Sequence, residues 1–538
     1  MKFLFILILS CLQLFTYGQE VLNLRYNLNY NNTIFENIIV TDSCYYTTSY
    51  SIPQSSNKVE GGFVKINLDG TINNTSFHKN DTMHIQFTST HSDLINTLDN
   101  NFAIMSKVSI VPGWSDLMFY KLTPNGDTIS TNYINTIHLD GNSILNVNAL
   151  IQNNDSTYNC IIHLEKNSNL LGGIALLKLS KTGELLWHKY FWGLGVNNYR
   201  ILRANSIIKY DVNKLLIGAT TIEANSPYEV NWKVHTKLYM TDTLGNLLWQ
   251  RTYWADTINN AVNGLTKTTD GGVVYCGNYG RYNTVNFGLD YQPQITKLDA
   301  NFDLEWRIKL DKWGSYNYTL NNILTLNDTE FVAVGNSFAT GENNMPFGKT
   351  GHLVKFNING KVLWERKYTK VPHFDGESNW ATHILYDVAL TPDSGFVMVG
   401  QSTNFYTDNG VPSGQQGWLV KVDKHGCLVP NCQQYDNVDT TTTDTTIVQP
   451  PVIIPENVLY PNPANTSLYY YHTQSDTTQQ QTAYMYNLQG KLVQQFNLSN
   501  SNITYSIDVS NFSSGIYLFI IKNELGEILR SDKVVVSH

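Results

Sequence analysis

The strongest constraint on the fold of this chain is an internal repeat. Residues 177–187 (LKLSKTGELLW) and 354–364 (VKFNINGKVLW) share a strand, a tight turn ending in glycine and a second strand. Glycine adopts the positive φ that such hairpins demand. The pattern occurs seven times, with turn residues Gly70, Gly126, Gly183, Gly245, Phe302, Gly360 and Gly426. Successive copies lie 56 to 66 residues apart, as expected for one structural unit used repeatedly.

Two other residue types recur in register with this turn. A lysine stands five residues before it in every copy except the fourth, which has Met240; the lysines are Lys65, Lys121, Lys178, Lys297, Lys355 and Lys421. Four residues after the turn, the middle copies have Trp187, Trp249, Trp306 and Trp364. The lysines are expected to be strand residues with buried stems, and the tryptophans to be packing residues. In the fifth copy Phe302 replaces glycine, and we expect Asn301 to take the positive φ instead.

A second motif precedes each turn and completes the unit. Residues 270–277 (DGGVVYCG) and 393–400 (DSGFVMVG) each combine a polar turn with a short apolar strand. Four antiparallel strands repeated about every 58 residues are typical of a propeller blade, whose faces are buried only by its neighbours. The sequence therefore predicts an all-β chain with a seven-bladed β-propeller over residues 19–432. Residues 19–33 are expected to supply an outer strand to a terminal blade and so close the ring.

The two ends of the chain differ from the repeats. Residues 1–18 combine Lys2 with an apolar run too short to span a bilayer, which predicts a signal peptide cleaved before Gln19. A second interpretation makes Cys11 a lipidated N-terminus. Residues 433–455 are rich in Thr and Pro and are expected to be an extended linker.

Cysteines are few, and two lie close together near the end of the repeats. An exported protein meets an oxidising compartment, so Cys427 and Cys432 are candidates for a small disulfide loop. Cys44, Cys160 and Cys276 lie in apolar strand-like segments and are expected to be buried small hydrophobic residues.

Residues 456–538 contain short alternating strands separated by Gly and Asn turns, which predicts a small immunoglobulin-like β-sandwich. Four ordered motifs mark this segment, and their residues are Tyr460, Pro461, Asn462 and Pro463, then Gly490, then Gly515 and Tyr517, and last Lys533. The segment resembles the C-terminal sorting domain of the type IX secretion (Por) system. The resemblance implies a partner in the outer-membrane secretion machinery, and a protein that is secreted or attached to the outer surface of a Gram-negative outer membrane. The repeats resemble those of secreted bacterial surface propellers.

The sequence contains no recognisable catalytic, cofactor or metal motif. The net charge is −8 with a pI near 5.9, which gives no sign of a nucleic-acid partner. Asp-x-x-Gly turns such as residues 242–245 lack the dense oxygen ligands of a calcium loop. We therefore expect no catalytic residues, no cofactor and no metal.

Loop lengths indicate which end of the ring carries the function. The turns between strands 1–2 and 3–4 of each unit are tight, whereas the 2–3 and 4–1 connections are long and aromatic. Trp192, Trp254, Trp313 and Trp380 lie in these connections and form a candidate ligand-binding face for a glycan or a protein. In the alternative interpretation, these tryptophans only cover the core.

The leading hypothesis is a monomeric, non-enzymatic binding or adhesion protein at the cell surface or in the extracellular space. Two alternatives remain open. One is a propeller-based secreted enzyme acting on polysaccharide or peptide, and the other is a purely structural surface component.

Overall fold

A computed structural model describes residues 21–428, Cys432 and residues 459–538, with gaps. The residues left out of these ranges are 54–57, 79–82, 88–93, 112–113, 136–138, 140–142, 166–171, 193–198, 225–232, 254–258, 284–287, 311–317, 341–345, 371–380, 405–413, 461–463, 473–480 and 499–502. The predicted signal peptide (1–18) and linker (433–455) therefore lie outside the described residues, except that Cys432 borders the linker. The chain divides into two compact units, Met1–Val448 and Gln449–His538.

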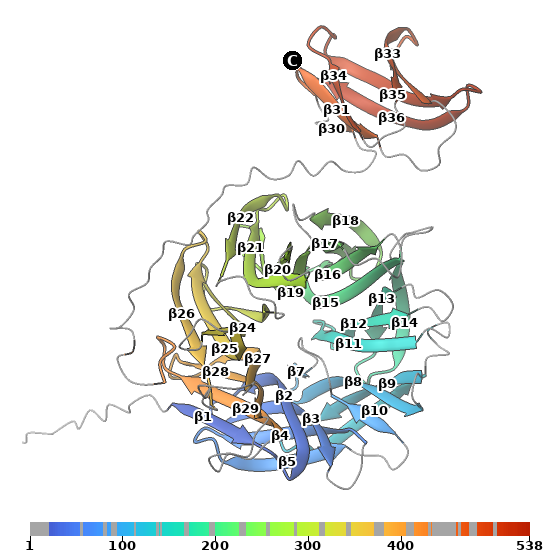
Figure 1. Ribbon diagram of the computed structural model, residues 1–538. Coiled ribbons are helices and arrows are strands. Elements are labelled where there is room, and N and C mark those ends of the chain that lie inside the picture. Colours follow the sequence, from blue (N-terminus) through green and yellow to red (C-terminus); the bar gives the residue numbers. More distant parts are fainter. Residues whose placement is uncertain are drawn as a thin grey trace, which may run out of the picture. The chain divides into compact units, whose positions relative to one another are not determined.

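The first unit consists of β-strands arranged around a ring (Figure 1). Antiparallel pairing groups the described strands β1 to β29 into sets of four, or of five in one case, and these sets are here called blades 1 to 7. Blade 1 contains β2 (Tyr30–Val40), β3 (Cys44–Pro53), β4 (Glu60–Asn67) and β5 (Ile72–His78). In blade 2, the innermost strand is split into β6 (His84–Gln86) and β7 (Leu94–Asn96), followed by β8 (Phe102–Val111), β9 (Trp114–Leu122) and β10 (Thr128–Ile134). Blade 3 contains β11 (Ser143–Gln152), β12 (Tyr158–Glu165), β13 (Gly172–Leu179) and β14 (Leu185–Trp192).

The remaining blades follow the same order from the innermost to the outermost strand. Blade 4 contains β15 (Tyr199–Asp211), β16 (Lys214–Ala224), β17 (Lys233–Asp242) and β18 (Leu247–Tyr253). Blade 5 contains β19 (Asn259–Lys267), β20 (Val273–Asn283), β21 (Gly288–Leu298) and β22 (Leu304–Lys309). Blade 6 contains β23 (Thr319–Thr325), β24 (Glu330–Thr340), β25 (Pro346–Asn357) and β26 (Val362–Tyr368). Blade 7 contains β27 (Thr382–Leu390), β28 (Phe396–Asn404), β29 (Gly414–Val422) and, from the start of the chain, β1 (Leu22–Tyr26).

The N-terminal strand closes the ring. β1 pairs antiparallel with β29, with Leu22 opposite Lys421 and Tyr26 opposite Gly417. It thus supplies the outer strand expected from residues 19–33. Side chains of blades 1 and 7, among them Phe35 and Val399, then share one hydrophobic cluster. The first and last blades are therefore neighbours in the ring, and neither leaves its apolar face in water.

Each turn between strands 3 and 4 is covered by the preceding blade. A Cβ added to Gly245 would lie 2.8 Å from the Trp187 ring, and one on Gly360 would lie 2.9 Å from Trp306. The six glycines at this position all have positive φ. Glycine is therefore favoured twice, by backbone conformation and by the closeness of the aromatic ring.

The fifth copy shows that one expectation was wrong. Phe302 itself takes the positive φ, at 63°, and not Asn301. The hydrogen-bonding pattern of the turn explains this, because Phe302 N donates to Asp299 O just as the glycine does in the other copies. The Phe302 ring is buried and lies edge-on to Trp249 of blade 4, with centroids 4.6 Å apart. This packing offsets the strain of a left-handed non-glycine residue.

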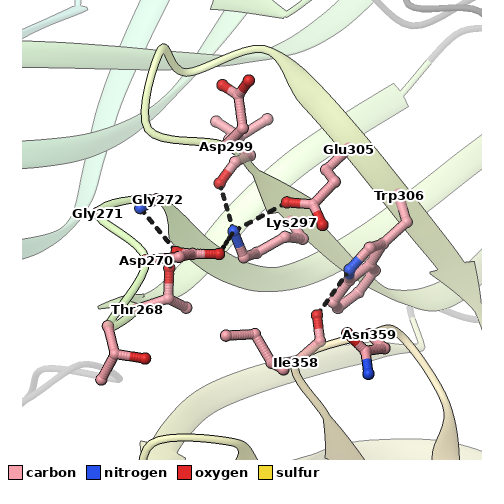
Figure 2. A network of polar contacts seen from close by, with 12 residues as sticks. Thr268, Asp270, Gly271, Gly272, Lys297, Asp299, Glu305, Trp306, Ile358 and Asn359 are labelled. Atoms are coloured by element: carbon pink, nitrogen blue, oxygen red, sulfur yellow. Dashed lines mark hydrogen bonds and ion pairs between the residues drawn. The ribbon is translucent and has the colours of Figure 1, made fainter.

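In four blades the repeated lysine ties the third strand to an acidic residue in or next to the turn between strands 1 and 2. Figure 2 shows the case of blade 5, where fully buried Lys297 forms ion pairs with Asp270 at 2.8 Å and Glu305 at 3.0 Å. Its Nζ also donates to the carbonyl oxygen of Leu298 at 3.0 Å. Equivalent pairs join Lys121 to Asp99, Lys355 to Glu330 and Lys421 to Asp393. In blade 4, where Met240 replaces the lysine, the turn residue Asp211 pairs instead with Lys214.

The second unit is a β-sandwich. Its three-stranded sheet contains β30 (Leu459–Tyr460), β31 (Ser467–His472) and β34 (Ile503–Asp508). Its four-stranded sheet has the order β33 (Leu492–Leu498), β32 (Gln481–Asn487), β35 (Gly515–Asn523) and β36 (Ile528–Val536). Side chains from both sheets, including Leu468, Tyr470, Phe519 and Val534, form a single core. The domain therefore has its own hydrophobic interior.

We predict that Lys297→Met lowers the free energy of unfolding by about 1–3 kcal/mol, because Asp270 and Glu305 then lose their shared cation. Burial opposes ionisation of Asp270, but hydrogen bonds from Lys297, Thr268 and the backbone hold its pKa down at about 2. This stabilising contribution is complete above pH ~4 and is lost as the pH falls toward ~2. Denaturant unfolding at pH ~7 and pH ~3 measures both effects, with Lys361→Met as the control at an exposed lysine. An equal loss for the two variants would contradict the prediction.

Candidate functional site

The two ends of the ring differ in their connections. The described turns between strands 1–2 and 3–4 are tight, and their first residue caps them: Asp242 Oδ1 accepts hydrogen bonds from the amides of Leu244 and Asn246 at 2.9 and 2.8 Å. The 2–3 and 4–1 connections leave from the opposite end, here called the long-loop end. Most of these connections lie outside the described residues.

Of the four predicted binding tryptophans, only Trp192 lies within the described residues. Trp192 is the last residue of β14, where it pairs with Gly173. Trp254, Trp313 and Trp380 lie outside the described residues. Their convergence on one face therefore stays a prediction.

In blades 5 and 7, amide side chains form hydrogen bonds within the strands near the long-loop end. In blade 5, Gln294 is fully buried, and its Nε2 donates to Asn260 Oδ1 and to the carbonyl oxygen of Asn278, the latter at 2.9 Å. In blade 7, Gln401 Oε1 accepts hydrogen bonds from Tyr386 Oη at 3.0 Å and from Gln415 Nε2 at 2.7 Å. These hydrogen bonds hold the buried amides in fixed positions, so the strands near this end carry polar side chains and remain rigid.

Asparagines at β-bulges link the innermost strands around the ring. Asn205, Asn263 and Asn321 each fall at a register shift in β15, β19 and β23. Each Nδ2 donates to a carbonyl of the next blade, to Val262 from Asn205, to Leu320 at 2.8 Å from Asn263, and to Leu385 at 2.7 Å from Asn321. We did not predict this feature, although the three residues recur at intervals of 58 in the sequence.

Blade 7 ends this series with a carboxylate at the closure seam. In β27 the register shift falls next to Asp387, which is buried. Its Oδ2 accepts a hydrogen bond from Ile38 N of blade 1 at 2.9 Å, and its Oδ1 accepts from Asn322 Nδ2 of blade 6 at 2.7 Å and from Val388 N at 2.8 Å. One side chain thus binds three blades together. Burial raises the pKa of Asp387 to about 6, although these donors act in the opposite direction.

Two further ionisable groups lie close to this seam. Burial and the neighbouring Glu36 carboxylate raise the pKa of Tyr386. Arg25 of β1 donates from Nη2 to the carbonyls of Ser402 and Gly414 at 3.2 and 3.1 Å. The seam therefore holds acidic, phenolic and cationic groups, but the contacts of Asp387 and Arg25 serve ring closure.

A groove opens between the outer strands of blades 2 and 3. It has a volume of about 560 Å³ and is lined by Asn132, Tyr133 and Ile134 of β10 and by residues 184–188 at the start of β14. Tyr133 donates to Asp116, and Asn132 Nδ2 donates to Thr182 O at 2.8 Å. Two of its polar groups are thus occupied, one by a contact within blade 2 and one by a contact between blades 2 and 3.

The structure describes all cysteines except Cys11. Cys427 and Cys432 form a disulfide with a Cα–Cα distance of 5.6 Å, while Cys44, Cys160 and Cys276 are buried and form no disulfide. Within the described ranges, no group of three or more His, Cys, Asp or Glu side chains is arranged to hold a metal ion. The described part of the chain also contains no helix long and apolar enough to cross a bilayer.

The sorting motifs lie on the strands and turns of the second unit. Gly490 has a positive φ in the turn between β32 and β33. Tyr517 of β35 donates to the carbonyl oxygen of Ser513 at 2.8 Å and packs on Phe512. Lys533 of β36 lies opposite Leu518, and Tyr460 of β30 lies opposite Tyr469. Pro461, Asn462 and Pro463 lie outside the described residues.

Comparison with known proteins identifies the tail. Residues 458–537 match the family model described as the secretion system C-terminal sorting domain. This domain implies export through the type IX system to the cell surface or the extracellular space, and interaction with that machinery. No curated protein matches the chain.

Several solved structures are similar to this chain at very low sequence identity. Drosophila Semaphorin 2a has a TM-score of 0.42 and 8% identity, with 97% of this chain and 99% of that chain covered. The β-propeller domain of the Trilobed protease from Pyrococcus furiosus has a TM-score of 0.39 and 9% identity, with 73% and 96% covered. A mutant of the Synechocystis apocarotenoid oxygenase has a TM-score of 0.33 and 11% identity, with 76% and 95% covered. The all-β propeller assignment itself follows from the strand pairing.

We predict that Asp387→Asn lowers the free energy of unfolding by about 1–3 kcal/mol. The amide nitrogen of the new side chain would face a backbone or side-chain donor at one of the two oxygen positions. The folded state binds the Asp387 proton more tightly than the unfolded chain does, in which this carboxyl has its ordinary pKa of 3.8. The contribution of this proton to the free energy of unfolding is therefore greatest below pH ~4 and is lost as the pH rises through about 6. The asparagine variant lacks this contribution.

The measurement is denaturant unfolding of wild type and variant from pH ~4 to pH ~7.5. Taking the difference between the two proteins removes the opposite effect of buried histidines such as His163, whose pKa burial lowers to about 4. A difference that does not change with pH would show that Asp387 titrates normally.

Proposed function

We propose that this chain is an exported, non-enzymatic binding or adhesion protein that acts as a monomer at the outer cell surface or in the extracellular space. The observation that carries the proposal is the sorting domain at residues 458–537. A tail of this family has value to the cell only if the attached cargo works outside. The propeller is that cargo, and the secretion machinery is its transient partner.

The asymmetry of the ring supports a binding role for the long-loop end. At the opposite end, acidic turn residues are held by lysines, as in the Asp270–Lys297 pair, and tight turns leave little surface to vary. At the long-loop end, buried amides such as Gln294 anchor the strands beneath connections that are rich in tryptophan. A rigid support under variable aromatic loops is a common arrangement for recognition. We propose a glycan or protein ligand held by Trp192, Trp254, Trp313 and Trp380.

Deleting residues 456–538 should abolish export. In the native host, we expect the truncated chain to keep a folded propeller and to accumulate inside the outer membrane, because the propeller has its own closed core. Quantitative mass spectrometry of cellular, surface and medium fractions measures the distribution. Normal surface levels of the truncated chain would refute the sorting role.

Replacing Trp254, Trp313 and Trp380 together with alanine should weaken ligand binding at least tenfold while the ring stays folded, since stacking on aromatic side chains contributes about 1 kcal/mol or more per ring. Glycan arrays and binding to host or matrix proteins provide the assay. Leu244→Ala, at an exposed turn of the opposite end, is the matched control. If the triple variant bound every wild-type ligand equally well, the tryptophans would be packing residues.

A further inference from the structure

The four-stranded sheet of the sorting domain has an outer face that its own domain does not cover. In β35 the side chains alternate, so that Tyr517, Phe519 and Ile521 enter the core. Ile516 and Leu518 point the other way and are 36% and 41% exposed. Apolar side chains on the outside of a small soluble domain cost free energy unless another surface covers them.

This face is hollowed into a groove of about 500 Å³. Its floor and walls come from β32, β35, β36 and the turn after β32, and its lining includes Tyr486, Leu488, Ile516, Leu518, Lys522 and Lys533. Leu488 is 72% exposed at the tip of that turn. The groove is thus an apolar trough with an aliphatic rim.

The charged residues that line the trough have one sign. Lys522 and Lys533 belong to its lining, and the described lining residues include no Asp or Glu. Two cations beside an apolar trough complement a partner that presents an apolar side chain flanked by acidic groups.

The same type of hairpin turn is covered in the ring but meets no described neighbour at Gly490 in the tail. Turns of the same type occur in the ring and in the tail, with an Asn or Asp side chain capping the backbone, as Asn357 and Asn487 do. In the ring, a Cβ on Gly360 would meet Trp306 of the preceding blade. In the tail, a Cβ on Gly490 would meet no described atom within 4 Å. The tail therefore lacks the cover that this hairpin has in every blade.

We propose that this trough is the surface by which the secretion machinery binds the sorting domain, and that its occupant is a machinery protein that inserts an apolar side chain flanked by carboxylates. The inference rests on the proposed function and deepens it, since it names the recognising face. Leu518 and Ile516 supply the apolar contact, and Lys522 and Lys533 supply the charge contact.

The test uses the full chain in its native host. We expect the paired substitution Ile516→Ser and Leu518→Ser to lower the exported fraction at least tenfold, and Lys522→Glu with Lys533→Glu to do the same. Leu525→Ser is the matched control, because Leu525 is 74% exposed but lies outside the trough. The charge variant guards against misfolding, since it leaves every core residue of the domain in place, and protease resistance of the retained protein checks its fold.

Photo-crosslinking identifies the occupant. A photoreactive amino acid in place of Leu518 should crosslink to a secretion-machinery protein, and one in place of Leu525 should not. A crosslink from position 518 only to a second copy of the chain, or normal export of both folded double variants, would overturn the proposal. If deletion of residues 456–538 blocked export while the double variants were exported normally, only this face would be refuted and the sorting role would stand.

Discussion

The ring depends on the contact that each blade makes with the one before it. A single four-stranded blade has two apolar faces and cannot bury either alone. Here the turn between strands 3 and 4 of each blade packs on a side chain of the preceding blade, such as Trp187 at Gly245 and Trp364 at Gly426. The closing contact follows the same chemistry, because Leu24 of β1 lies against Gly70, and Tyr26 donates to the carbonyl of Gly70 at 2.7 Å. The N-terminal strand thus substitutes for the fourth strand that blade 7 lacks.

The parts of the fold that depend on local geometry were predictable from sequence. A turn that requires positive φ selects glycine, so a run of regularly spaced glycines disclosed the repeat and its length. The expectation for the fifth copy was wrong, because the local preference of asparagine for positive φ does not decide which turn residue takes that conformation. The structure shows that the turn fixes which residue takes that conformation, and that Trp249 stabilises the residue found there.

The parts that depend on contacts between blades were not predictable in the same way. Asn205, Asn263 and Asn321 look in sequence like ordinary polar strand residues. Only the bulges direct their amides to the next blade, and a bulge shifts the alternation on which sequence interpretation relies. The burial of Lys297 was not predictable either, although its partners lie within its own blade. A lysine in a strand predicts a solvated amine, whereas Asp270 and Glu305 allow this one to be buried. Candidate binding residues such as Trp313 belong to the long connections. The sequence indicates how these connections are spaced along the chain, but not how they are arranged in space.

Both units contain the same type of glycine hairpin turn, but the turn has a different role in each. In the ring, every glycine turn is a point of contact, and the energy of covering it holds successive blades together. In the sorting domain, the turn at Gly490 keeps the same backbone hydrogen bonds, with Gly490 N donating to Asn487 O, but has no described neighbour in its own domain. A domain of about 80 residues has a small core and gains little from leaving Leu488, Ile516 and Leu518 in water. Their exposure is explained if a partner protein covers this surface. The propeller needs no such partner for its stability, because its ring buries its own apolar faces.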